Sequence, residues 1–167
     1  MGYYSKVIYV WNEPWWQDAG LNGRISASEG PISFSRDTIP ETDEQWSISC
    51  FVVGQRGRDW SKLPRSAQQE QAWKQFCDHF APIVGDVPLP AKVFEQEWVK
   101  QGYFRGAPCP VLRPGAMTEF GHALKIPFGS IHFAGTETSI VWKGYMEGAV
   151  RSGQRVADEV EQALSTT

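Results

Sequence analysis

The chain has 167 residues, 41% of them hydrophobic, and a formal net charge of −3. This length suits one domain or a compact two-lobed unit, and eight tryptophans argue against a disordered protein. No basic cluster occurs, which excludes the electrostatic footprint of a nucleic-acid-binding protein. Cys50, Cys77 and Cys109 are widely spaced without a metal-ligand pattern, which favours a reducing compartment and no metal site. Without a secretory signal or a bilayer-length apolar run, we expect a cytoplasmic protein with no membrane partner.

The first third of the chain has the pattern of a succession of short strands. Residues 6–11 are β-branched and aromatic, and segments 24–28, 32–35 and 46–53 have a similar character. Turn-forming dipeptides and the polar run 37–43 separate these segments. The succession predicts an antiparallel meander.

A helix is predicted after these strands. Ser66 and Gln69 fit a capping box at its start, and Pro82 is expected to end it. Residues 93–99 alternate between apolar and polar types, as a strand does. The stretch 102–115 is rich in glycine and proline and is typical of a loop.

The stretch 130–155 reads as a strand, a turn and a helix. The apolar run 131–134 predicts a short buried strand, and a polar turn, 135–138, follows it. From Tyr145 onward, apolar residues recur at helical spacing. The start of a helix carries unpaired N–H groups and partial positive charge, so such a unit can receive an anion. Taken alone, the pattern favours a packing unit without a ligand.

The residues of this stretch are more specific than their pattern. HFAGTET, followed by W-x-G-Y-M-E-G-A-V-x-S-G-x-R, closely resembles the C-terminal flavin-binding segment of flavin-containing amine oxidases, the monoamine oxidase family, particularly its fungal members. The resemblance implies FAD as the cofactor, with its isoalloxazine ring against the turn and the helix start. The residues that match these family contacts are Gly135, Thr136, Glu137, Gly144, Tyr145 and Met146.

The resemblance extends over nearly the whole chain. Residues 6–16 resemble the K-x-I-x-x-x-x-E-P-x-W strand of the family's substrate domain. The implied fold is α+β. Residues 1–100 would form an antiparallel or mixed substrate-domain sheet with packing helices, and residues 101–167 the last strand and helix of the FAD domain. The implied reaction converts a small-molecule amine to an imine, with release of H2O2.

Lys6 and Tyr145 are the candidate catalytic residues that the resemblance implies. Lys6 matches the family lysine that hydrogen-bonds through a water to flavin N5, with a solvated strand-end lysine as the alternative. Tyr145 matches one wall of the aromatic cage around the substrate amine, and the opposite wall falls at Pro108, which has no π face. Trp142 is a further candidate for the pocket. It and the adjacent pair Trp15 and Trp16 could contribute aromatic surface, but core packing is the role expected for each of the three. Ala107 stands where membrane-bound relatives attach FAD through cysteine, so any FAD is expected to be non-covalent.

The G-x-G-x-x-G turn that binds the FAD pyrophosphate in this family does not occur in the sequence. We therefore expect the chain to supply a flavin-ring edge and half a substrate pocket, and to need a complementary N-terminal chain for oxidase activity. Two alternatives stay open. One is an FAD-free enzyme that isomerises or cyclises a hydrophobic metabolite in the pocket, and the other is a non-enzymatic binding domain. Uncovered sheet edges predict a homo-oligomer.

Overall fold

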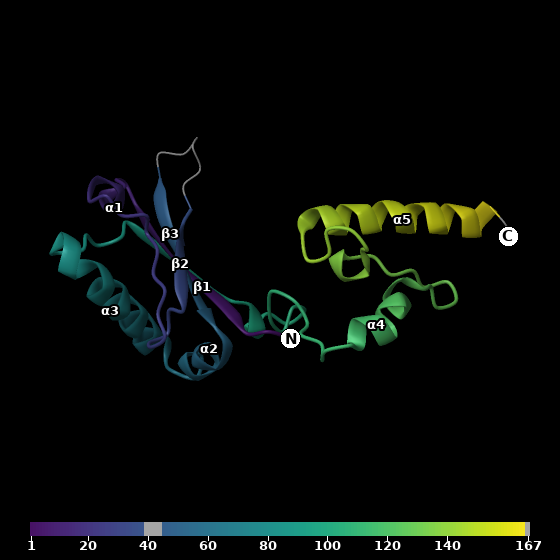
Figure 1. The fold of residues 1–167 in the computed structure, drawn as a ribbon, viewed down its shortest axis with the longest axis horizontal. Coiled ribbons are helices and arrows are strands. Elements are labelled where there is room, and N and C mark those ends of the chain that lie inside the picture. The colour runs from purple at the N-terminus through teal and green to yellow at the C-terminus, as the bar shows by residue number, and fades with distance from the viewer. Residues whose placement is uncertain (39–44, 166–167) are drawn as a thin grey trace. The chain divides into compact units, whose positions relative to one another are not determined.

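A computed structural model describes residues 1–38 and 45–165. The chain divides into two compact units, residues 1–108 and 109–167, which are described separately (Figure 1). Most of the polar run expected to separate two strands, 37–43, lies outside the described residues. The domain boundary expected near residue 100 refers to the domains of the whole family fold and stays a prediction.

The first unit is built on a four-stranded sheet. Every neighbouring pair of strands is antiparallel, as expected for the predicted α+β fold. The predicted meander is wrong, because the first strand lies between the third and the fourth and not beside the second. The strand expected at 24–28 is reduced to one bridge, between Ser26 and Phe34. The N–H of Ile25 donates to the hydroxyl oxygen of Ser35 at 2.7 Å, and not to the carbonyl of a neighbouring strand. In sheet order, the strands are β2 (Phe34–Asp37), β3 (Trp46–Val53), β1 (Tyr4–Trp11) and β4 (Lys92–Glu97).

The helices of the first unit lie on one side of this sheet (Figure 1). The longest begins directly after Pro64, so Ser66 lies inside its first turn and the predicted capping box is wrong. Pro82 lies inside the last turn and does not end the helix, because its missing N–H costs only one bond so close to the end. These helices are α1 (Trp15–Asp18), α2 (Gly54–Trp60) and α3 (Arg65–Val84), followed after β4 by the 3-10 helix η1 (Trp98–Lys100).

The core lies between the sheet and these helices. Alternate residues of β1, among them Val7, Tyr9 and Trp11, are buried on the helix side. Phe76 of α3 is fully buried among aromatic rings, 5.0 Å from the ring of Tyr9 and 5.7 Å from that of Trp11. Trp16 is also fully buried, and its indole N–H donates to Asp37 at 2.8 Å. The core packing expected for Trp16 is therefore confirmed.

The second unit consists mainly of helices and loops. The buried strand expected at 131–134 is not formed, since Ile131 makes only one bridge, to Phe128, and is 57% exposed. A strand needs a partner for its backbone groups, and the described residues of this unit offer only that bridge. The helices are α4 (Ala116–Phe120), the 3-10 helices η2 (Gly121–Lys125) and η3 (Thr136–Thr138), and α5 (Met146–Ser165) (Figure 1).

Glu97, at the end of β4, binds side chains from three separate segments of the first unit. Its carboxylate accepts hydrogen bonds from the Tyr3 hydroxyl at 3.1 Å, the Ser61 hydroxyl at 2.5 Å and the Lys100 ammonium at 2.6 Å. Burial by itself would raise the pKa of Glu97, but the hydrogen bonds from Lys100, Ser61 and Tyr3 outweigh it and lower the pKa below its ordinary 4.5. The ionised form is therefore the one that stabilises the fold.

Because the pKa of Glu97 is lower in the folded chain, its contribution is present above pH 4.5 and is lost as the pH falls through the folded value. Glu97→Gln is expected to lower the free energy of unfolding at neutral pH by roughly 1–3 kcal/mol. The variant should also lose less stability than the parent on acidification. Urea titrations at several pH values measure both effects, with Glu13→Gln, an exposed position, as the control. Equal acid sensitivity of the parent and Glu97→Gln would contradict this role.

Candidate functional site

Lys6 lies on the sheet face opposite the helices. It is half-buried in β1, between Phe51 of β3 and Gln96 of β4, so it is not a solvated strand-end residue. Its ammonium lies 5.2 Å from the centre of the Phe51 ring, which stacks on Phe34 at 4.5 Å. Within the described residues, no carboxylate forms an ion pair with Lys6. This face therefore presents a cation over an aromatic surface.

Ala107 and Pro108 lie at the end of the first unit. The N–H of Ala107 donates to the carbonyl of Gly2 at 3.2 Å, which ties this segment to the start of the chain. Gly106 fits closely against the same residue, since a Cβ atom there would lie 2.5 Å from the Gly2 carbonyl oxygen. Ala107 is half-buried, whereas Pro108 is exposed. The alanine side chain offers no thiol for a covalent bond.

The predicted flavin contacts lie together in the second unit, around η3 and the start of α5. The Thr136 hydroxyl accepts a hydrogen bond from the N–H of Gly144 at 2.6 Å. Gly144 has a φ of 88° and Trp142 a φ of 58°, a backbone region that residues other than glycine rarely adopt. A Cβ atom at Gly148 would lie only 2.3 Å from the Trp142 carbonyl oxygen. The turn is therefore held closely against the first turn of α5.

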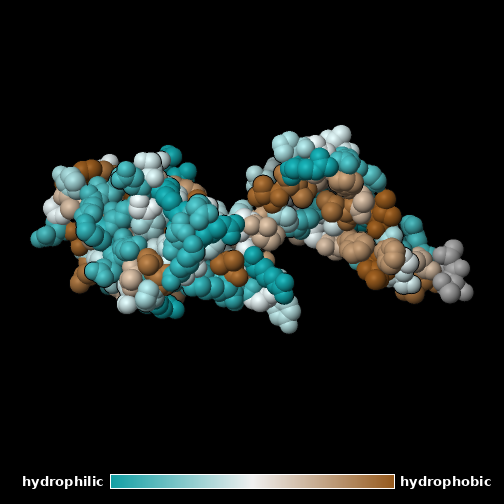
Figure 2. Space-filling view, turned by 90° about the horizontal axis from the view of Figure 1, so that it is seen from below, coloured by the Kyte–Doolittle hydropathy of each residue, from teal (hydrophilic) through white to brown (hydrophobic). Residues whose placement is uncertain are grey.

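This turn leaves its large side chains open to solvent within its own unit. Trp142 is 56% exposed, Tyr145 65% and Met146 88%, so the core packing expected for Trp142 is wrong. The rings of Trp142 and Tyr145 meet edge to face at 5.7 Å. Figure 2 shows that hydrophobic side chains gather on the surface of this unit. The start of α5 thus combines unpaired N–H groups with an aromatic surface.

Residues that the sequence did not single out hold the turn in place. The N–H of Gly135 donates to the Ser152 hydroxyl at 2.9 Å. Arg155 donates to the carbonyl of Phe133 at 2.7 Å and pairs with Glu159, which also lies 3.1 Å from His132 Nδ1. Hydrogen bonds from His132 and Arg155 lower the pKa of Glu159. Ser152 and Arg155 are the first and last residues of the S-G-x-R part of the motif. That part of the motif is the sequence feature from which their role could have been predicted.

The described residues contain no cluster of three or more His, Cys, Asp or Glu side chains that could hold a metal ion. In the same part of the chain, no helix is both long and apolar enough to cross a bilayer.

Comparison with known proteins places these features in a family. Residues 1–161 match the family described as flavin containing amine oxidoreductase. The chain belongs to the flavin-containing amine oxidase family. Among curated relatives of this chain, the probable flavin-containing monoamine oxidase A of Dictyostelium discoideum is 33% identical over 165 residues, 98% of this chain and 35% of the relative. Amine oxidase [flavin-containing] B of Bos taurus is 32% identical over 168 residues, 98% of this chain and 32% of the relative.

Solved amine oxidase structures show the same fold. Cyclohexylamine oxidase from Brevibacterium oxydans is 31% identical, with a TM-score of 0.84 over 99% of this chain and 36% of that structure. A putrescine oxidase bound to putrescine is 22% identical, with a TM-score of 0.81 over 95% of this chain and 35% of that structure, and is similar in fold alone. The chain therefore spans about a third of the length of the proteins it matches.

Tyr145→Ala is expected to leave the fold largely intact while impairing any activity that uses the aromatic surface. The side chain is 65% exposed, and within the described residues its ring meets that of Trp142, itself exposed. The free energy of unfolding should change by less than about 0.5 kcal/mol, as at most surface positions. Thermal unfolding measures this change, and ligand binding or turnover measures the loss of function. If stability falls as much as activity, Tyr145 is a packing residue.

Proposed function

We propose that the chain forms the C-terminal part of an FAD-dependent amine oxidase that converts an amine to an imine with release of H2O2. The observation that carries the proposal is the turn at 135–146, whose family-matching residues surround the exposed start of α5. Family membership over residues 1–161 supports the cofactor, since the family is described as flavin-containing.

The second unit offers a surface that fits a flavin ring. The first N–H groups of α5 have no acceptor within the helix and lie at the positive end of its dipole. Such an end favours an electron-rich ring edge. Gly144 has no other heavy atom within 4 Å of a would-be Cβ, so its backbone is open to a close approach. Gly135, Thr136, Glu137, Gly144, Tyr145 and Met146 would together hold the ring.

The remaining candidates have separate tasks in this proposal. The ammonium of Lys6 would place positive charge near the reacting part of the cofactor and assist reaction with oxygen. Tyr145 and Trp142 would present aromatic surface to the substrate amine. Ala107 has no thiol, so the cofactor would be held without a covalent bond. Pro108 has no π face, so it would add no aromatic wall for the substrate amine. The chemistry that FAD supplies when bound is acceptance of a hydride equivalent from the carbon beside the amine nitrogen, followed by transfer of electrons to oxygen.

The first experiment is the visible absorption spectrum of the purified chain, before and after addition of FAD. In this proposal, flavin is retained through gel filtration only when a complementary N-terminal chain from an amine oxidase is added. Amine-dependent H2O2 release should then follow. A mixture that stays colourless, or one that holds flavin without oxidising any amine tested, would contradict the proposal. Retention by the chain alone would show that the second chain is not needed.

The exposed apolar side chains of the second unit favour association with another protein surface. The partner in this proposal is the complementary N-terminal chain. Without that chain, a homo-oligomer is expected, and light scattering at micromolar concentration tests for it. A monomer that also fails to bind the complementary chain would contradict both.

A further inference from the structure

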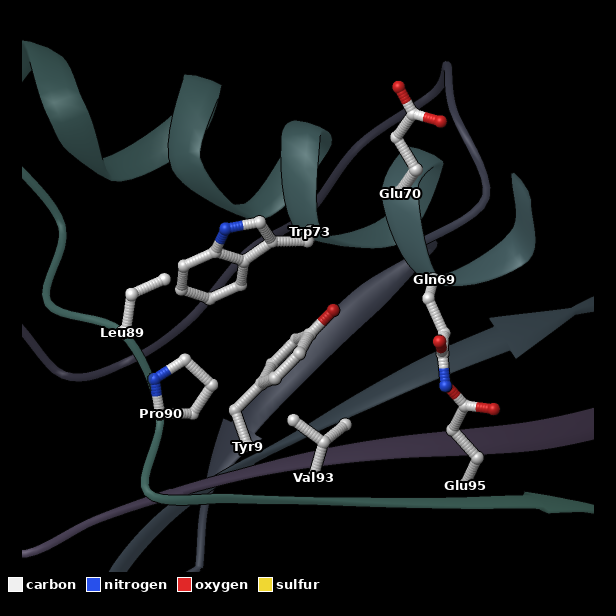
Figure 3. A pocket seen from close by; sticks show the side chains of 8 residues that line it. All are labelled: Tyr9, Gln69, Glu70, Trp73, Leu89, Pro90, Val93 and Glu95. Atoms are coloured by element: carbon white, nitrogen blue, oxygen red, sulfur yellow. The ribbon is translucent and has the colours of Figure 1, made fainter. Parts of the chain in front are cut away.

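A cavity of about 430 Å³ lies in the first unit between α3, β4 and the segment that joins them (Figure 3). Its walls are mainly apolar, with Tyr9 and Val93 on the sheet, Trp73 on the helix and Leu89 on the connecting segment. Figure 3 shows the carboxyl group of Glu95 at the end of the cavity away from Leu89. The volume falls in the range of small-molecule sites.

This cavity is on the other side of the sheet from Lys6. In the register of β1 and β4, Tyr9 pairs with Val93 and Val7 with Glu95, and the odd-numbered positions of β1 face the helices. Lys6 is at an even-numbered position and faces the opposite side. A ligand in this cavity is therefore separate from the face that carries Lys6.

Glu95 has an unusual environment for a carboxylate. Its side chain is only 9% exposed, and its Oε1 atom is buried without a hydrogen-bond partner. Its Oε2 atom lies 3.4 Å from the guanidinium of Arg65, whose side chain is 74% exposed. The next carboxylate on the same face, Glu97, is bound by Tyr3, Ser61 and Lys100. Burying a carboxylate oxygen without a hydrogen bond costs free energy. Because Glu97 has three donors and Glu95 Oε1 has none among the described residues, we infer that a donor from a ligand completes the Glu95 site.

We propose that this cavity binds an organic ammonium ion with an apolar body. An N–H of the cation donates to Glu95 Oε1, and the apolar body packs against Trp73 and Leu89. The ring of Trp73 adds a face of the kind that attracts cations. Glu70 contributes a second carboxylate to the lining, and no lysine or arginine belongs to it. This site lies beyond the proposed oxidase function and does not depend on it.

The test is a titration of the full chain with 2-phenylethylammonium and, in parallel, with the neutral 2-phenylethanol, followed by amide and indole NMR shifts. The ammonium ion is expected to saturate shifts at the Trp73 indole and at residues 89–95, and the alcohol to bind at least about tenfold more weakly. Glu95→Gln keeps the shape of the side chain and removes its charge. It should weaken ammonium binding about ten- to hundredfold, without changing the weak binding of the alcohol.

Two further variants keep the test decisive. Leu89→Lys, at a position that is 80% exposed, places a positive charge at the cavity without disturbing the core and should also weaken ammonium binding. Lys6→Met, on the other face, should leave it unchanged. Equal binding of the alcohol and the ammonium ion, full affinity in Glu95→Gln, or shifts confined to residues around Lys6 or Tyr145 would each overturn the proposal. Absence of saturable binding by the folded parent chain would overturn it too.

Discussion

Phe76→Ala is expected to lower the free energy of unfolding of the first unit by about 3–5 kcal/mol, as full truncation of a buried phenylalanine does. Phe76 is 0% exposed and lies at the centre of an aromatic cluster. Its ring stacks on Trp73 at 5.5 Å and on Trp11 at 5.7 Å, and it lies 4.8 Å from Phe80. Removing it therefore leaves a cavity among large rigid rings that cannot readily close. Urea unfolding followed by near-ultraviolet circular dichroism measures the change.

The matched control for this prediction is Leu89→Ala. Leu89 is 80% exposed, so its truncation should change stability by less than about 0.5 kcal/mol. Phe76→Leu keeps part of the volume and should fall between the two. A loss below about 1 kcal/mol for Phe76→Ala would mean that the aromatic cluster is not the source of the unit's stability.

The sequence was a good guide where one pattern decides the local structure. The β-branched and aromatic run beginning at Lys6 and the segment 46–53 form the two central strands, β1 and β3. The helical spacing from Tyr145 predicted α5, which begins at Met146. In β1 and β3 the burial of one face and the periodicity favour the same element. In α5 the periodicity alone predicted the helix, since Met146, Val150 and Leu164 are exposed.

Elements that depend on distant partners could not be predicted in this way. The run 131–134 is apolar, yet it forms no strand, because pairing depends on a neighbouring strand and not on the run itself. The segment 24–28 likewise does not form a strand, and the N–H of Ile25 donates to the Ser35 hydroxyl. The local sequence pattern does not show which distant donors and acceptors compete for the backbone groups of a segment.

The candidate site divides in the same way. The motif identified the turn at 135–146, whose conformation follows from local residues such as Thr136 and Gly144. It could not reveal that Ser152 and Arg155 hold that turn from the next turns of α5. Glu95 was also missed, because only the three-dimensional structure shows that its Oε1 atom is buried without a hydrogen-bond partner.

Lys6→Met is expected to slow the reaction of the substrate-reduced flavoprotein with oxygen by about 10²–10³-fold, the usual effect of removing one preorganised electrostatic group. This prediction rests on the proposed function and applies to the chain combined with its complementary N-terminal chain. Methionine retains the length and apolar body of the side chain, so packing against Phe51 is preserved while the charge is lost. Stopped-flow spectroscopy separates reduction by the amine from reaction with oxygen, and only the second step should change by this factor.

Lys92→Met is the matched control, because it also removes one positive charge from the sheet. Lys92 is the first residue of β4 and pairs with Val10 of β1. Its side chain is on the same face of the sheet as Lys6, but it is exposed. The oxygen reaction of Lys92→Met should stay within about twofold of the parent, since exposed charges are screened by solvent and salt. Equal slowing by both variants would assign the effect to the overall charge of the sheet. A normal oxygen reaction in Lys6→Met, with flavin still bound, would exclude Lys6 from the chemistry and leave it a lysine packed on an aromatic face.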